Sequence, residues 1–248
     1  MIYLVPVIFF VIALVFSMLG MGGSQLYIPI MFWLGMDFKT EAIPLGMLLN
    51  VVNSATASVT YGRKRMIQWR IALPFGVCML LFAPLGAWVN TGLPEKPVIL
   101  IFSVFTALAA ILMLSGWKPK KGELSSAERL AIGIIGGSVL GFFAGLIGRG
   151  GGSFVVPLLF IMGLDTKLAA ATSAIVITFS GTSSFISHIA LAANPDWMMW
   201  GLSVAAVFLG SRTGSKLMAG KLKSKSIKFI FGFVLLGVAA LLIIKDVL

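Results

Sequence analysis

Acidic residues, histidine and cysteine are scarce in this chain of 248 residues, which has eight aspartates and glutamates, one histidine and one cysteine. The single Cys78 excludes an intramolecular disulfide and a paired-cysteine relay, so nothing indicates a redox mechanism. An enzyme needs a nucleophile, a base or a metal cluster, and the chain is poor in the side chains that build them. We therefore expect no enzyme activity, no metal and no cofactor.

Charged residues are few as well, at 11% of the chain, whereas 59% of the residues are hydrophobic and the mean hydropathy is +1.05. This composition indicates a membrane protein with several spans. No cleavage site for a signal peptide precedes the first apolar run, so we expect that run to stay in the membrane. The net charge of +11 does not indicate nucleic-acid binding, because the basic residues lie in a few short loops.

The apolar runs form two series of five. The first covers about residues 2–19, 24–36, 42–61, 70–90 and 97–117, and the second about 130–148, 152–164, 168–189, 197–216 and 226–244. A span needs about 20 helical residues, so the second run of each series is predicted to be a half-helix. We predict an all-α polytopic membrane protein with a transmembrane repeat at 1–117, the basic cytoplasmic linker KPKKGELSSAER at 118–129, and a second repeat at 130–248.

The two series align without a gap at an offset of 128 residues. The identical pairs are not only glycines, and they include Gly22 with Gly150, Gly23 with Gly151, Pro29 with Pro157, Asp37 with Asp165, Lys39 with Lys167 and Trp69 with Trp197. Chance matching of glycine-rich membrane sequence would not place a proline, an aspartate, a lysine and a tryptophan in one register. The chain is therefore predicted to be an internal duplication.

Basic loops predict how the repeats are oriented. After the third run, the first repeat has Arg63, Lys64, Arg65 and Arg70, whereas the equivalent loop ALAANPDW has no lysine or arginine. After the fourth run the bias is reversed. Lysine and arginine mark cytoplasmic loops, so the repeats are predicted to be inverted, with both termini outside the cell membrane. Ten crossings and a re-entrant hairpin in each repeat satisfy this bias equally.

Glycine-rich motifs, GMGGSQ at 20–25 and GRGGGS at 148–153, interrupt both repeats at equivalent places. Inverted repeats with short, interrupted segments are typical of secondary transporters, whose substrates bind at broken helices near the midplane. The free amides and the positive dipole end of a helix beginning there attract an anion. We therefore predict an anion-binding site at the two breaks.

The predicted substrate-binding residues come from the breaks and from the helices that follow them. Glycines let the backbone approach the anion, while serine and glutamine donate hydrogen bonds. A buried arginine is costly in a membrane, which favours a functional role over snorkelling to the interface. The set comprises Arg149, Gly22, Gly23, Ser24, Gln25, Gly150, Gly151, Gly152, Ser153, Asn50, Asn53, Thr178 and Thr182.

Several polar and small residues also fit ordinary structural roles. Asn50, Asn53, Thr178 and Thr182 are equally suited to hydrogen bonds between helices, and His188 is suited either to an interface or to proton coupling. The remaining residues are predicted to serve structure: Gly136, Gly137, Gly141 and Gly145 as a packing face, Asp37 and Asp165 as helix caps, and Trp197 and Trp200 as an aromatic belt.

The paired patterns GMGGSQLYIPIMFWLGMDFKTEA and GRGGGSFVVPLLFIMGLDTKLAAATS resemble the signature of the TauE/SafE-type sulfite exporter family. The resemblance covers essentially the whole chain. It implies a membrane transporter for sulfite or for organosulfonates such as sulfoacetate. Arg149 aligns with Met21, so the charge would come from one repeat only, and the resemblance assigns Arg149 no role.

Residues and resemblance together predict a secondary transporter that exports a small sulfur-containing anion by alternating access. An interior-negative potential favours outward movement of one negative charge by about 2.3 kcal/mol per 100 mV, so export needs no ion coupling. The alternative is an anion channel or a transporter of another small anion. The expected partners are the anion and the lipid bilayer, and an oligomer is compatible with the sequence.

Overall fold

The computed structural model describes residues 4–90, 92, 94, 97, 100, 103–104, 107–108, 110–111, 114–115, 125–147, 152–190, 192, 195–220 and 222–244. These residues fold into helices and turns, with no strand among them, so the predicted all-α class is confirmed. In chain order the helices are α1 Leu4–Leu19, α2 Ser24–Trp33, the π-helical turn η1 Phe38–Ala42, α3 Ile43–Arg63, α4 Trp69–Asn90, α6 Ser126–Ile147, α7 Gly152–Ile161, α8 Thr166–Ile189, α9 Trp197–Gly220 and α10 Ser224–Leu242.

Three of the described helical stretches are long and apolar enough to cross a membrane, namely Phe38–Arg63, Trp69–Val89 and Thr166–Ile189. Shorter apolar helices cover Val5–Leu19 and Leu130–Leu146. Large apolar side chains such as that of Trp88 also cover the outer surface. An outer surface of this kind suits contact with lipid, because in water it would be an exposed hydrophobic patch.

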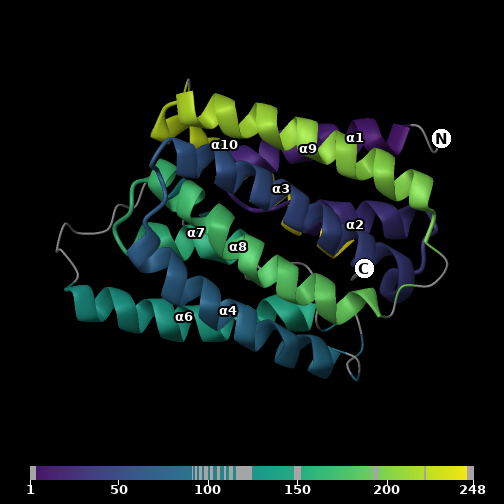
Figure 1. The fold of residues 1–248 in the computed structure, drawn as a ribbon, viewed down its shortest axis with the longest axis horizontal. Coiled ribbons are helices and arrows are strands. Elements are labelled where there is room, and N and C mark those ends of the chain that lie inside the picture. Colours follow the sequence, from purple (N-terminus) through teal and green to yellow (C-terminus); the bar gives the residue numbers. More distant parts are fainter. Residues whose placement is uncertain are drawn as a thin grey trace.

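Two parallel helix pairs flank the centre of the molecule. α1 lies along α9, and α4 lies along α6, while α3 and α8 contact each other between the pairs and run in opposite directions (Figure 1). The helices of the two predicted repeats therefore pack against one another. One hydrophobic cluster includes residues from both.

Equivalent glycines allow the close approach within both pairs. A Cβ added at Gly86 of α4 would lie 1.9 Å from the carbonyl oxygen of Phe142, and one added at Gly214 of α9 would lie 2.0 Å from that of Leu14. Gly214 follows Gly86 by 128 positions, and Phe142 follows Leu14 by the same number. Residues that the predicted duplication pairs therefore make equivalent contacts.

The predicted packing face of α6 is confirmed. Cβ atoms added at Gly137, Gly141 and Gly145 would lie 2.6, 2.7 and 1.8 Å from backbone atoms of α4. Gly136 faces the side chain of Leu158 in α7. Small residues let membrane helices approach closely, since van der Waals packing largely drives their association.

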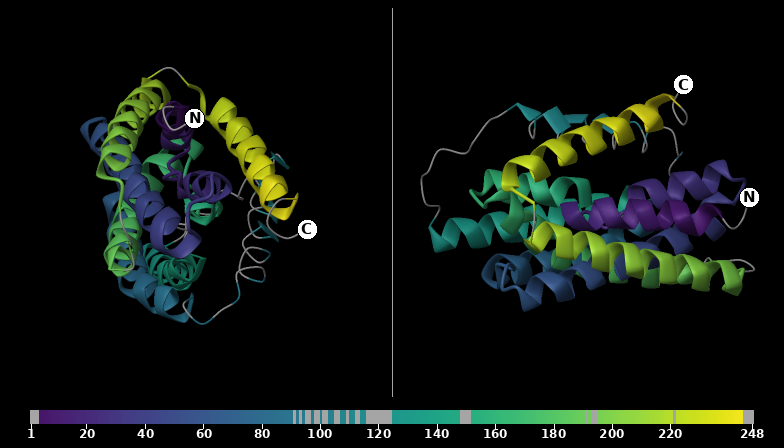
Figure 2. Two further views of the ribbon diagram at one scale, coloured as in Figure 1. Left: turned by 90° about the vertical axis from the view of Figure 1, so that its right-hand side faces the viewer. Right: turned by 90° about the horizontal axis from the view of Figure 1, so that it is seen from above.

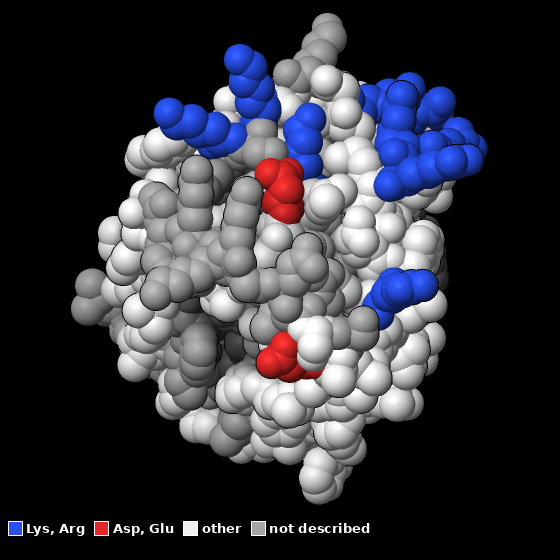
Figure 3. Space-filling view, turned by 90° about the vertical axis from the view of Figure 1, so that its left-hand side faces the viewer, with Lys and Arg blue, Asp and Glu red and all other residues white. Residues whose placement is uncertain are grey.

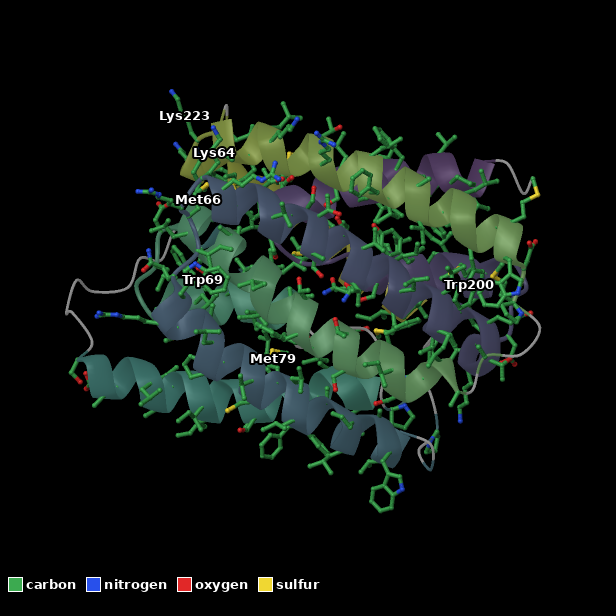
Figure 4. All side chains as sticks on the ribbon, viewed as in Figure 1. Lys64, Met66, Trp69, Met79, Trp200 and Lys223 are labelled. Carbon is green, nitrogen blue, oxygen red and sulfur yellow. The ribbon has the colours of Figure 1, made fainter. Side chains whose placement is uncertain are left out.

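Basic residues gather at one end of the molecule. Lys64, at the end of α3, and Lys223, just before α10, lie at the same end (Figure 4). Figure 3 looks onto this end and shows lysine and arginine side chains along its upper rim. α1 begins at the opposite end, and α10 ends toward it (Figure 2). We call the lysine- and arginine-rich end the basic end.

Candidate functional site

The first glycine-rich motif separates α1 from α2 by four residues, 20–23. Gly20, Gly22 and Gly23 have φ angles of 68°, 85° and 113°, a region that only glycine enters without steric cost. The Met21 N–H donates to the Phe16 carbonyl over 3.1 Å between nitrogen and oxygen, which closes the end of α1. The chain then starts α2 at Ser24 in a new direction.

Two asparagines of α3 bind this interruption. Asn50 and Asn53 are three residues apart and so share a helix face. Asn53 Nδ2 donates to the Gly22 carbonyl oxygen, and the Ser24 N–H donates to Asn50 Oδ1 across 3.4 Å. Predicted residues of the first break and of the following helix are thus brought together.

Amide groups at this position are buried but only partly hydrogen-bonded. Gln25, Asn50 and Asn53 are each 0% exposed. No described residue is a hydrogen-bond partner for Gln25 Nε2, Gln25 Oε1, Asn50 Nδ2 or Asn53 Oδ1. A buried unsatisfied polar group costs about 1–3 kcal/mol, so such groups call for an explanation. We refer to Gln25, Asn50 and Asn53 as the amide cluster.

The amide cluster lies where the first break meets α8. A Cβ added at Gly22 would lie 1.9 Å from Asn50 Oδ1, and one added at Gly181 of α8 would lie 2.9 Å from Asn50 Nδ2. Nitrogen and oxygen atoms are visible between α3 and α8 in the middle of the molecule (Figure 4). The site is therefore built from both halves of the chain.

Aromatic side chains and a hydroxyl group also lie beside the amide cluster. The Tyr27 hydroxyl lies 3.4 Å from Asn53 Nδ2, and the Phe9 ring stands edge-on to the Tyr27 ring at a centroid distance of 5.1 Å. None of these groups carries a charge. The described part of the site offers hydrogen-bond donors and acceptors in an apolar surrounding, which suits a small polar ligand.

Part of the predicted site falls outside the described residues, namely Arg149, Gly150 and Gly151. Gly152 begins α7, and the side chain of Ser153 is likewise outside the description. Their predicted roles in binding stay predictions.

The two predicted threonines of α8 bond to their own helix. Thr178 Oγ1 donates to the Ala174 carbonyl at 2.9 Å, and Thr182 Oγ1 donates to the Thr178 carbonyl at 2.7 Å. Thr178 Oγ1 also lies 3.4 Å from Ser58 Oγ of α3. Thr178 thus makes the contact between helices that was the alternative expectation, whereas the bond of Thr182 stays within α8. A role in binding stays a prediction for both.

Sequence reasoning missed the support that α8 gives to the break. Ser173 Oγ donates to the Gly20 carbonyl oxygen at 2.8 Å, although the two residues are 153 positions apart. A Cβ at Gly20 would also lie 1.9 Å from the Ala170 carbonyl oxygen. The only signal in the sequence is a hydroxyl within an apolar run.

Residues predicted to serve structure have mixed outcomes. Asp37 and Asp165 cap η1 and α8, as predicted, because their side chains accept the backbone N–H of Lys39 and Lys167. The belt prediction is wrong for Trp200, which is 8% exposed because it packs into the core. Trp197 is 71% exposed, as a belt residue should be.

The predicted choice for His188 between an interface and proton coupling is not decided by its contacts. The side chain is buried, and Nδ1 lies 2.8 Å from the Ser184 carbonyl oxygen of its own helix. A role in coupling stays a prediction.

A family model described as sulfite exporter TauE/SafE matches residues 5–242. The chain belongs to the TauE/SafE family. The resemblance seen in the two glycine-rich patterns is thus confirmed. Membership makes the chain a membrane transporter of the TauE/SafE type, and the predicted membrane location is confirmed at this level.

Curated relatives of this TauE/SafE protein carry transporter names. Probable membrane transporter protein y4hK of Sinorhizobium fredii is 29% identical over 219 residues, which covers 85% of this chain and 87% of the relative. Probable membrane transporter protein YunE of Bacillus subtilis is 24% identical over 256 residues, with 93% of both chains covered. Sulfite exporter TauE/SafE family protein 5 of Arabidopsis thaliana is 33% identical over 112 residues, 42% of this chain and 24% of the relative. No solved structure matches the TauE/SafE chain significantly.

Proposed function

We propose that this TauE/SafE transporter moves small sulfur-containing anions, sulfite or organosulfonates, outward across the cell membrane by alternating access. The observation that carries the proposal is the amide cluster, which is fully buried, lies at a break between helices and has four polar atoms without a partner among the described residues. Irregular backbone inside a membrane is tolerated where it lines a cavity or binds a ligand.

The chemistry of the amide cluster suits an oxyanion. Gln25 Nε2 and Asn50 Nδ2 are donors for anion oxygens, and the start of α2 adds the positive end of a helix dipole. Amides bind an anion without burying a compensating charge of their own. In this proposal Arg149 and the second break supply the positive charge from the other half.

We further propose that the halves are inverted repeats, with the basic end in the cytoplasm and both termini outside. Support comes from the equivalent contacts of Gly86 and Gly214 and from the shared end of Lys64 and Lys223. Alternating access then follows from rocking the α1–α9 pair against the α4–α6 pair, about α3 and α8 at the centre.

Flux in proteoliposomes tests the substrate and the site together. The purified protein is given sulfite, sulfoacetate, taurine, sulfate and chloride, with and without an imposed potential. We expect saturable, potential-dependent flux of sulfite or a sulfonate. Gln25→Leu should reduce it about tenfold to a hundredfold, the effect of losing one hydrogen bond to a charged group.

The matched control is Ser138→Ala, because Ser138 is a partly exposed polar residue whose hydroxyl donates to the carbonyl of Ile134 in its own helix and to no other described residue. This variant should keep the flux. Conductance without saturation would instead identify an anion channel. Equal flux in the Gln25→Leu variant and the wild type would remove the amide cluster from the site, and unchanged flux in Arg149→Gln would remove the arginine.

A further inference from the structure

Helix α9 presents two different faces. One face is buried against α1 and α3: the backbone of Gly214 approaches Leu14, and Ser211 Oγ donates to the Asn53 carbonyl at 2.7 Å. The opposite face exposes Arg212 and Lys216. Two cations therefore stand one helical turn apart on this exposed face.

These cations line a groove of about 520 Å³ along α9, together with Leu209, Thr213 and Leu217. Neither Arg212 nor Lys216 forms an ion pair with a residue that the structure describes. A groove lined by two positive charges and by leucine side chains is complementary to a molecule with a negative head and hydrocarbon chains.

The position along α9 places the pair at the depth of lipid headgroups. Trp197, at the start of the helix, is 71% exposed and marks one membrane interface. With a rise of 1.5 Å per residue, Arg212 lies roughly 22 Å and Lys216 roughly 28 Å farther along. The hydrocarbon layer is about 30 Å thick, so Lys216 lies at the opposite interface. The long side chain of Arg212 reaches the same interface by extending along the helix.

The duplicated register supplies an internal comparison. The positions equivalent to Arg212, Thr213 and Lys216 are Pro84, Leu85 and Trp88 of α4. Leu85 and Trp88 are 52% and 76% exposed, so this face also points outward, but it carries no cation. The same outward face is thus apolar in one half and doubly basic in the other, which packing within the chain does not require.

We propose that the α9 groove is a binding site for an anionic phospholipid in the leaflet at the basic end. Arg212 and Lys216 hold the headgroup phosphate, the Thr213 hydroxyl lies beside it, and the acyl chains run along the apolar side of α9. Clustered basic side chains at the membrane surface attract acidic lipids in this way. The site is independent of the amide cluster.

Native mass spectrometry of the purified transporter tests the site, with phosphatidylglycerol compared with phosphatidylcholine. We expect preferential retention of phosphatidylglycerol. The double variant Arg212→Gln, Lys216→Gln should weaken that preference roughly thirtyfold, because each cation near the surface strengthens the binding of an acidic lipid roughly fivefold. The control Arg63→Gln, Lys64→Gln removes the same charge from the end of α3, at the same end of the molecule, and should keep the preference.

Two results would overturn the proposal. One is an equal loss of phosphatidylglycerol in both double variants, which would indicate general attraction to the basic end. The other is a change in the number of chains per particle in Arg212→Gln, Lys216→Gln, which would make the groove a contact between copies. Thermal unfolding in phosphatidylcholine nanodiscs, expected to be the same for both double variants, checks that the chain folds.

Discussion

At the scale of single residues, Asn50 joins the first break to α8. Its Oδ1 accepts the Ser24 N–H at the start of α2, and its side chain lies against Gly22 and Gly181. In this structure the amide oxygen therefore stands where an oxygen of a bound anion would receive the same hydrogen bond. An arriving anion has to share that donor with Asn50 or displace it.

Asn50→Asp tests this competition. A carboxylate at the start of a helix is electrostatically favourable, so the variant should fold. It would repel an anionic substrate, and we expect the KM for transport to rise at least tenfold, with thermal unfolding measured in parallel because Asn50 is buried. An unchanged KM would show that the anion does not approach the start of α2.

Gly22→Ala tests the backbone of the break. The φ of 85° costs an L-residue about 1–2 kcal/mol, and the added Cβ would also meet Asn50 Oδ1 at 1.9 Å. Gly35→Ala is the matched control, because Gly35 has a φ of 92° but nothing within 4 Å of an added Cβ. The thermal midpoint and the flux should both fall further in Gly22→Ala than in Gly35→Ala. Equal losses in the two variants would mean that only the φ angle matters.

Residue chemistry predicted part of the site. Glycine at 22 and 23 predicted the irregular backbone, and Asn50 and Asn53 were predicted to lie in the helix that follows the first break. The bond from Ser173 to Gly20 was not predictable, because it joins residues 153 positions apart and depends on how α8 crosses the break. A hydroxyl in an apolar run does not say which carbonyl it will bind.

At the scale of elements, the starts of the two short helices α2 and α7 were predicted better than their ends. α2 and α7 begin at residues 24 and 152, as expected, but end at 33 and 161 rather than at 36 and 164. Gly35 and Gly163 follow with φ angles of 92° and 87° and reverse the chain. Apolar patterning does not mark that point, because the residues around both glycines are apolar as well.

Helix pairing predicts a graded effect of glycine substitution. Gly214→Ala should destabilise the protein by about 2 kcal/mol or more, because the added Cβ meets the Leu14 carbonyl oxygen at 2.0 Å and overpacking costs typically 1–3 kcal/mol. Gly86→Ala should behave alike at the equivalent contact. Gly201→Ala, in the same helix as Gly214 but with nothing within 4 Å, should be neutral or stabilising. Thermal unfolding in detergent measures the stability of the three variants. A similar loss in Gly201→Ala would contradict the idea that close helix contact causes the destabilisation.

The cap of η1 predicts a pH effect. The pKa of Asp37 is lowered, first by the backbone N–H of Thr40, then by the Thr40 hydroxyl and, less strongly, by the Lys39 N–H and charge. A carboxyl whose folded pKa is depressed stabilises the fold above its unfolded pKa of about 4 and loses that contribution as the pH falls through the folded value. The thermal midpoint of Asp37→Asn should therefore be below that of the wild type at pH 7, and the gap should close in acid. A gap that is constant with pH would contradict this cause.

At the scale of the whole molecule, composition predicted the helical membrane class, and the charge bias predicted which loops share an end. Neither predicted that α1 lies along α9, since contacts between distant runs leave no trace in hydropathy.

Labelling tests the orientation of the chain in the membrane. In a variant without Cys78, a cysteine at Lys64 or Lys223 should react with an impermeant reagent only from the cytoplasm, and one at Trp197 only from outside. The reverse pattern would invert the topology, and labelling of all three from one side would contradict the inverted repeats.

The α1–α9 pair has a consequence for synthesis of the chain. Leu14 and Gly214 are 200 positions apart, so at about 5–20 residues per second α1 waits roughly 10–40 s for its neighbour to leave the ribosome. During that interval the surface later covered by α9 faces lipid or the insertion machinery. A nascent chain halted before α9 is therefore expected to stay bound to a membrane chaperone, whereas one released after α9 would not.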